Sequence, residues 1–99
     1  FQPHLFSRTR DFVDGFAESL SMLDELLLLE IYPARELPIP GINSQFLLDN
    51  ISLTNKKLVS KEELLEEIKS RDIEVMLTAG AGDIGAMVDD IKKIMEVKG

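Results

Sequence analysis

The feature that most constrains this fold is a short unbroken apolar run, Leu26–Leu29, which leads into a loop rich in proline. The run is far shorter than the roughly 20 apolar residues of a membrane-spanning helix. Pro33, Pro38 and Pro40 prevent the segment that follows from forming a regular element, because proline fixes φ and lacks a backbone donor. Continuous apolar strands are typical of parallel sheets covered on both faces. We therefore predict a buried strand over residues 26–31.

Helical and extended patterns alternate on both sides of this strand. Apolar residues at helical spacing predict helices, and Ser60 followed by Glu63 forms a capping box at the start of one of them. The predicted helices are 9–23, 44–50, 61–70 and 84–97, and the further predicted strands are 57–59 and 73–78. This alternation is typical of an α/β fold with a parallel sheet and right-handed crossovers. Residues 1–3 resemble the end of a strand, so the pattern looks truncated at its N-terminus.

The helical patterns also predict the core and the helix caps. Ser7 or Thr9 is the expected N-cap of the first helix, and Asp83 is the expected N-cap of the last. The residues expected in the core from the two most regular stripes are Phe12, Phe16, Ile84, Met87, Val88, Ile91, Ile94 and Met95.

Composition excludes several classes of protein. The 99 residues contain 11 basic and 18 acidic side chains, and the net charge of −7 argues against nucleic-acid binding, which needs a basic face. With no cysteine and one histidine, neither a disulfide framework nor a zinc cage is expected. Nothing at the N-terminus resembles a signal peptide, and a chain beginning at Phe1 suggests an excised piece. We expect one soluble domain over residues 1–99, with neither a nucleic-acid nor a membrane partner.

Residues 80–85, Gly-Ala-Gly-Asp-Ile-Gly, match the G-x-G-x-x-G pattern of dinucleotide-binding loops. That fingerprint also needs an acidic residue on a second strand about 20 residues later, and only 14 residues follow Gly85. Asp83 places a negative charge where a pyrophosphate would lie. A structural turn or a substrate-facing loop is therefore favoured over dinucleotide binding.

The N-terminal loop gathers the only histidine, two arginines and two hydroxyl groups. Arg8 can clamp a carboxylate or phosphate with two parallel hydrogen bonds, and His4 can donate to an anion. The alternative is that the hydroxyls cap the helix and that the arginines are solvated. Tyr32 follows the predicted strand and belongs at the same sheet edge, where it either contacts a ligand or lies in a rigid surface loop. No carboxylate pair is expected to line a cleft, so no catalytic residue and no metal ligand is assigned.

Three segments together resemble one family closely. Residues 1–10 (FQPHLFSRTR), 31–36 (IYPARE) and 80–84 (GAGDI) are similar to the C-terminal domain of the Mur ligases. The F-Q-P-H…S-R-T stretch is specific for the alanine-adding member, whereas G-A-G-D-I alone is a weak signal. The resemblance spans nearly the whole chain and implies most of that third domain, with a Rossmann-like parallel sheet flanked by helices.

The resemblance also implies an activity for the full-length parent. Mur ligases of this type are cytoplasmic bacterial enzymes of peptidoglycan synthesis. They use ATP and magnesium to convert the carboxylate of UDP-N-acetylmuramate to an acyl phosphate, which the amine of L-alanine attacks. By the same resemblance, the substrate-binding residues are His4, Ser7, Arg8 and Tyr32, and the rim of the nucleotide cleft is formed by Gly80, Gly82 and Asp83.

This sequence departs from the family pattern in two respects. Leu5 and Phe6 stand where many members have arginine and tyrosine, which removes one cation and one hydroxyl. The chain also lacks the G-x-x-x-x-G-K-[ST] phosphate loop, so we expect this piece alone to be inactive and not to bind ATP or magnesium tightly. The alternative hypothesis is a stand-alone α/β module that binds a small ligand or a protein.

Overall fold

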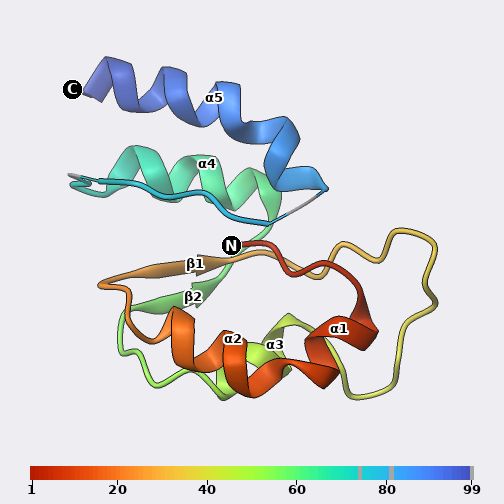
Figure 1. The fold of residues 1–99 in the computed structure, drawn as a ribbon. Coiled ribbons are helices and arrows are strands. Elements are labelled where there is room, and N and C mark those ends of the chain that lie inside the picture. Colours follow the sequence, from red (N-terminus) through yellow and green to blue (C-terminus); the bar gives the residue numbers. More distant parts are fainter. Residues whose placement is uncertain (74, 81, 99) are drawn as a thin grey trace.

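A small parallel sheet lies between two layers of helices in the computed structural model (Figure 1), which describes residues 1–73, 75–80 and 82–98. The strands are β1 (Leu26–Leu28) and β2 (Lys56–Leu58), paired in parallel with Leu27 opposite Lys57. The helices are α1 (Phe6–Asp11), α2 (Val13–Leu20), α3 (Ser44–Asp49), α4 (Lys61–Ser70) and α5 (Asp83–Lys98). The predicted α/β class with a helix-flanked parallel sheet is confirmed, although β1 is shorter than the predicted strand and β2 begins one residue earlier than predicted.

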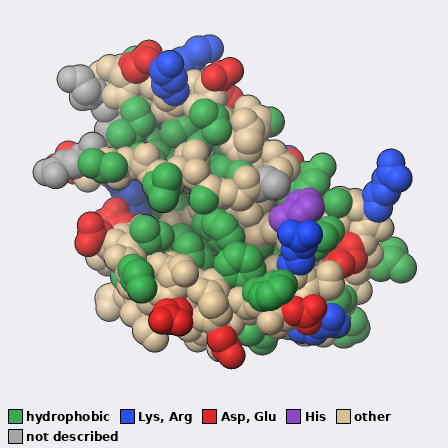
Figure 2. All heavy atoms as spheres, viewed as in Figure 1, with side chains coloured by type: hydrophobic (Ala, Val, Ile, Leu, Met, Phe, Trp, Pro, Cys, Tyr) green, Lys and Arg blue, Asp and Glu red, His purple; other side chains and the backbone are tan. Residues whose placement is uncertain are grey.

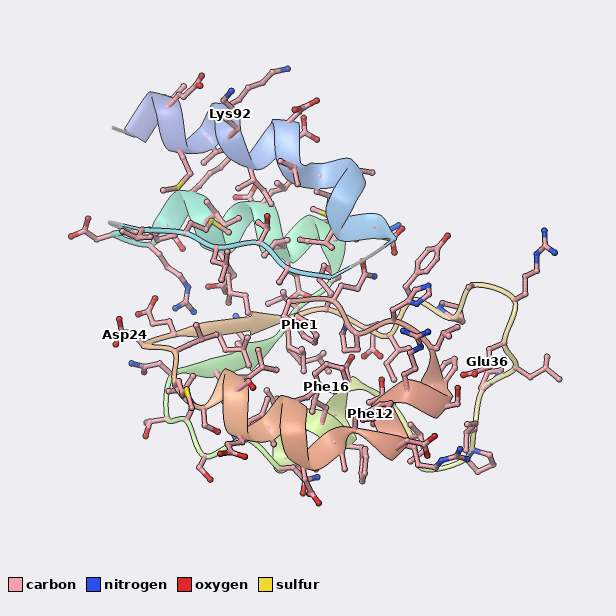
Figure 3. All side chains as sticks on the ribbon, in the orientation of Figure 1. Phe1, Phe12, Phe16, Asp24, Glu36 and Lys92 are labelled. Atoms are coloured by element: carbon pink, nitrogen blue, oxygen red, sulfur yellow. The ribbon has the colours of Figure 1, made fainter. Side chains whose placement is uncertain are left out.

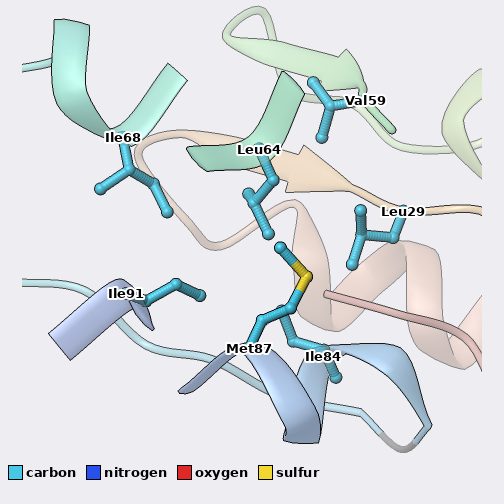
Figure 4. Close-up of a cluster of buried hydrophobic side chains, with 7 residues drawn as sticks. All are labelled: Leu29, Val59, Leu64, Ile68, Ile84, Met87 and Ile91. Atoms are coloured by element: carbon cyan, nitrogen blue, oxygen red, sulfur yellow. The ribbon is translucent and has the colours of Figure 1, made fainter. Parts of the chain in front are cut away.

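The four leucines of residues 26–29 contribute to two hydrophobic clusters, because their side chains alternate between the two faces of the sheet. Successive side chains of a strand point to opposite faces, and Leu26 and Leu28 pack with α2 and α3 in one buried cluster. Leu29 belongs to a second cluster, formed with residues of α4 and α5 (Figure 4). Leu27 is partly buried against this second cluster. The sheet is therefore covered on both faces, as an unbroken apolar strand predicts.

The N-terminal segment runs beside β1 as a further extended chain. The Phe1 ammonium donates to Leu27 O at 2.8 Å, and Leu29 N donates to Phe1 O at 2.9 Å. The same parallel pattern continues between Pro3 and Tyr32, at 2.8 Å. On its other side, Gln2 N donates to Ala79 O at 3.1 Å and the residue pairs in parallel with Gly80. Residues 1–5 thus connect β1 to the glycine-rich segment, as the strand-like character of residues 1–3 predicts.

The first predicted helix is wrong in its boundaries and in one core position. The structure forms two helices, α1 and α2, because Phe12 leaves the helical conformation between them with φ −117° and ψ 20°. Its side chain is 62% exposed and points away from the sheet, whereas Phe16 lies below Phe1, with ring centroids 5.7 Å apart (Figure 3). Helical spacing could not show this break, because residues 12 and 16 share one face only if the helix is continuous.

The strand predicted over residues 73–78 forms no ladder in its described part, residues 73 and 75–78; position 74 lies outside the described residues. A strand requires a hydrogen-bonded neighbour, and within the described residues the chain alongside this edge, residues 1–5, pairs with Ala79 and Gly80 rather than with residues 73 and 75–78. Val75 and Leu77 are 90% and 77% exposed. They line a groove of about 930 Å³ between this segment, Phe1 and the turn from α2 to β1. Figure 2 shows hydrophobic side chains gathered on this face.

The helix signals at α3 and α4 are confirmed. Asn43 caps α3 by accepting from Phe46 N at 2.8 Å. Ser60 and Glu63 form the reciprocal capping box of α4, with both bonds at 3.1 Å. A capping box satisfies two orphan N–H groups locally, which explains why its sequence signal is reliable.

The predictions for α5 are partly wrong. Asp83 is the first residue of the helix rather than its N-cap, and Val88 is 42% exposed rather than buried. Ile84, Met87 and Ile91 occupy the predicted core stripe. None of the helices in the described ranges is long and apolar enough to cross a membrane.

We expect Leu28→Ala to lower the free energy of unfolding by about 2–5 kcal/mol, because this fully buried side chain leaves a cavity under the sheet. Leu37→Ala is the matched control, since Leu37 is 82% exposed. Its effect should stay within about 0.5 kcal/mol. Denaturant unfolding of both variants measures the difference, and equal costs would contradict the assigned core.

Candidate functional site

The site is built where three loops meet at the carboxyl ends of the parallel segments. Ligands of open α/β sheets bind at this edge. His4 pairs in parallel with Tyr32, and Leu5 N donates to Tyr32 O at 2.9 Å, which joins the N-terminal loop to the loop after β1. The contact of Gln2 with Ala79 and Gly80 brings in the glycine-rich segment. The N-terminal loop and Tyr32 thus lie at one sheet edge, as predicted, and the glycine-rich segment lies beside them.

Aromatic stacking orders the centre of the site. The rings of His4 and Tyr32 stack with centroids 5.9 Å apart and planes 14° from parallel. The Tyr32 ring also covers Gly82, whose φ is +88° and where a Cβ atom would collide with the ring carbons. Glycine is thus required at position 82 for two reasons, its backbone conformation and its close approach to an aromatic face. This packing of His4, Tyr32 and Gly82 forms one wall of the site.

Glu36 attaches the proline-rich loop to the start of α1. Its carboxylate accepts from Ser7 N at 2.8 Å and from Ser7 Oγ at 2.5 Å. The Ser7 hydroxyl hydrogen bond is the main cause that holds the pKa of the Glu36 carboxyl below its ordinary value of 4.5. The predicted caps of this helix are therefore wrong: Ser7 donates to Glu36, and Thr9 Oγ1 donates to Leu5 O at 2.9 Å. Figure 3 shows Glu36 on the long loop beside α1.

Gln2 is a buried polar residue at the junction of the three loops. Only 3% of it is exposed, and its amide nitrogen lies 3.2 Å from both Glu30 O and Asp83 Oδ2. Its carbonyl oxygen accepts from Ile84 N at 2.8 Å, which satisfies a backbone donor at the start of α5. Gln2, Asp83 and Lys61 help to line a cavity of about 190 Å³, where Lys61 Nζ lies 3.6 Å from Asp83 Oδ1.

The side chains of two candidate ligand-binding residues have no hydrogen-bond or ion-pair partner within the part of the chain that the structure describes. The Arg8 side chain is exposed and forms no ion pair or hydrogen bond there, and the His4 imidazole makes no hydrogen bond. The neighbouring Arg10 instead pairs with Asp11 at 2.8 Å. Figure 2 shows the histidine reaching the surface with a basic side chain beside it. The exposed position of Arg8 is compatible with the predicted anion clamp and with the alternative of a solvated arginine.

The described residues do not gather three side chains able to hold a metal ion. Of the seven candidate residues, His4, Tyr32, Gly80, Gly82 and Asp83 lie around the loop junction, Ser7 is engaged with Glu36, and Arg8 is exposed on α1.

Sequence reasoning missed Gln2 and Glu36. A glutamine between Phe1 and Pro3 in an extended segment is a signal for a buried polar contact. Glu36 had no comparable signal, since its partner is 29 residues away.

The parallel sheet, its two helical layers and the loop cluster at its carboxyl edge define a Rossmann-like α/β domain. No family model matches the chain. It is 64% identical, over 96% of its length, to the UDP-N-acetylmuramate–L-alanine ligase of Flavobacterium johnsoniae. The same-named enzymes of Cytophaga hutchinsonii and Porphyromonas gingivalis are 62% and 55% identical over 97% of the chain.

The chain spans about 21% of the length of these relatives. Identity of 55–64% over nearly all of its residues establishes homology to one portion of the UDP-N-acetylmuramate–L-alanine ligases. The predicted resemblance to the alanine-adding Mur ligases is thereby confirmed.

We expect Gly82→Ala to displace Tyr32 from His4, because a Cβ atom at this position meets the Tyr32 ring. Loss of the ring-to-ring nuclear Overhauser contacts between His4 and Tyr32 measures this displacement. Gly15→Ala is the control, since nothing lies within 4 Å of its added Cβ atom in α2. That change should preserve the contacts and favour the helix by up to about 1 kcal/mol. Preserved contacts in Gly82→Ala would refute the wall of the site described above.

We expect the Glu36 carboxyl to titrate with a midpoint below 4.5, because Ser7 stabilises its charged form. Since the pKa is lowered in the folded chain, the stabilisation is complete above the ordinary value and is lost as the pH falls through the lowered one. The Glu36 carboxyl carbon and the Ser7 amide proton should follow the same midpoint by NMR. In Ser7→Ala the midpoint should return toward 4.5, and an unchanged midpoint would refute the assigned cause.

Proposed function

We propose that this chain is most of the C-terminal domain of an ATP-dependent ligase that joins L-alanine to UDP-N-acetylmuramate. The observation that carries this proposal is the 50–64% identity to enzymes named UDP-N-acetylmuramate–L-alanine ligase. The domain would be residues 1–99, as a single unit of a longer cytoplasmic bacterial enzyme in peptidoglycan synthesis. Its role is to close over the site and to hold the substrates, rather than to supply a catalytic base.

The geometry supports a binding role for the N-terminal loop. Arg8 presents an exposed guanidinium without a partner among the described residues, and such a group binds a carboxylate or a phosphate bidentately. In this proposal, Arg8 contacts the carboxylate of L-alanine or the acyl phosphate, and His4 donates to the same anion. Holding the reactants in a productive orientation lowers the barrier without a proton transfer by these residues. Tyr32 fixes the His4 ring by stacking, and Ser7 fixes the start of α1 through Glu36.

ATP and magnesium do not fit the residues of this chain as their principal site. The sequence contains no phosphate loop, and the described residues gather no three potential metal ligands. We therefore assign both to the remainder of the longer protein, with Gly80, Gly82 and Asp83 on the rim of the nucleotide cleft. Asp83 already pairs with Lys61 and accepts from Gln2. Its charge therefore orders the rim and disfavours direct contact with a phosphate.

The alternative is a stand-alone α/β module that binds a small ligand or a protein. The G-x-G-x-x-G pattern favours a nucleotide as that ligand. Titration of the chain with NADH separates the hypotheses, since the module would show saturable binding below millimolar concentration and a ligase domain would not.

We expect Arg8→Ala in the full-length ligase to lower kcat/KM for L-alanine by about tenfold or more, because a charge-assisted hydrogen bond contributes about 1.5–3 kcal/mol. Arg10→Ala is the matched control on the same helix, since Arg10 already pairs with Asp11. Its kinetic constants should remain within about twofold of the parent. Steady-state kinetics with varied L-alanine and saturating ATP measure both variants. Equal constants for Arg8→Ala and the parent would defeat the proposed role.

A further inference from the structure

We propose that Gln2 is a positioning residue that joins the two rims of the site. One rim is the N-terminal segment, which carries His4 and leads into α1 with Arg8, and the other is Gly82 and Asp83 at the start of α5. Through Gln2 the two rims move together. This inference deepens the function proposed above and rests on it for its kinetic consequence. Neither rim alone explains why a carboxamide is needed at position 2. The need becomes clear from the three polar groups that face it.

The side chain of Gln2 contacts three polar groups from two separate segments, the chain after β1 and the start of α5. Its amide nitrogen donates to Glu30 O, which follows β1, and to the Asp83 carboxylate, each at 3.2 Å. Its carbonyl oxygen accepts from Ile84 N at 2.8 Å. Donor and acceptor are needed together, and glutamine is the residue of this length that carries both on one planar group.

Burial makes these contacts costly to lose. Gln2 is 3% exposed, and a buried polar group without a partner carries its full desolvation cost. The backbone adds two constraints, because Gln2 N donates to Ala79 O at 3.1 Å and a Cβ atom on Gly80 would collide with Gln2 O. The backbone of Ala79 and Gly80 thus lies in close contact with the Gln2 backbone, and the Gln2 side chain is hydrogen-bonded to Asp83.

The same residue determines the position of the ligand-binding groups. His4 is two residues beyond Gln2, in the segment that pairs with Tyr32, and Tyr32 in turn covers Gly82. These contacts form a closed series. Gln2 bonds to Asp83, the neighbouring Gly82 lies against the Tyr32 ring, and that ring stacks on His4, two residues from Gln2. Loss of the hydrogen bond between Gln2 and Asp83 interrupts this series of contacts, so that Gly82 no longer holds the Tyr32 ring against His4.

The test reverses the polarity of one hydrogen bond. Gln2→Glu keeps the acceptor for Ile84 N but removes the donor and places a carboxylate beside Asp83. Asp83→Asn alone keeps an acceptor for the Gln2 amide. In the double variant, the amide introduced at position 83 can donate to the carboxylate introduced at position 2, which restores the bond in the opposite direction. Gln45→Glu is the matched control, because exposed Gln45 donates to Asp49 Oδ1 at 2.7 Å on α3, outside the loop junction.

In the full-length ligase, Gln2→Glu should lower kcat/KM for L-alanine by about tenfold per folded enzyme, measured well below its unfolding temperature. The double variant should recover to within about threefold of Asp83→Asn, and Gln45→Glu should match the parent. A purely structural role would lower the unfolding temperature of Gln2→Glu and leave kcat/KM per folded enzyme unchanged, which would overturn the proposal. Equal losses in Gln2→Glu and the double variant would also overturn it.

NMR of residues 1–99 tests the coupling without any substrate. Gln2→Glu should shift the His4 and Gly82 resonances together, and the double variant should move both back toward the parent values. Unshifted His4 resonances in Gln2→Glu would overturn the inference. If Arg8→Ala is kinetically silent while this NMR coupling holds, the proposed binding role of Arg8 fails and the positioning role of Gln2 stands.

Discussion

The structure depends on one parallel hydrogen-bond ladder, between residues 1–5 and the chain from Leu27 to Tyr32. This ladder is made by backbone groups and so places whole segments rather than single side chains. It aligns the end of the N-terminal segment with the end of β1, and its second edge reaches Ala79. Because parallel segments end on the same edge of a sheet, His4, Tyr32 and the glycine-rich turn converge there. The site is a direct consequence of strand direction.

Packing on both faces gives this ladder its rigidity. The alternating leucines of β1 bury themselves in two separate clusters, so that neither helical layer can shift without exposing apolar surface (Figures 1 and 4). The site itself is held differently, by polar contacts of Gln2 and Glu36 and by the stack of His4 on Tyr32. An apolar core thus lies beneath a polar site, in which the Arg8 side chain has no hydrogen-bond or ion-pair partner among the described residues. Such a division is compatible with the anion-binding role proposed for Arg8.

Local signals were good predictors where the interaction itself is local. The capping box of Ser60 and Glu63 involves residues three apart, and α4 begins where it predicts. Helical spacing failed at Phe12, because the break between α1 and α2 places that ring in solvent. The strand expected over residues 73–78 has the right composition, yet a strand forms only against a neighbour, and composition does not show how far that neighbour extends.

By itself, the sequence determined the α/β class, through the unbroken leucine run between helical patterns. It also determined the kinship, through three motif loops taken together, of which the N-terminal one is specific. It also identified His4, Arg8 and Tyr32 as candidate ligand-binding residues from their chemistry. Only the tertiary structure decided that Gln2 connects the two rims and that Glu36 holds the start of α1. Their partners are 81 and 29 residues away. No local pattern encodes such contacts, because the chain must fold before donor and acceptor meet.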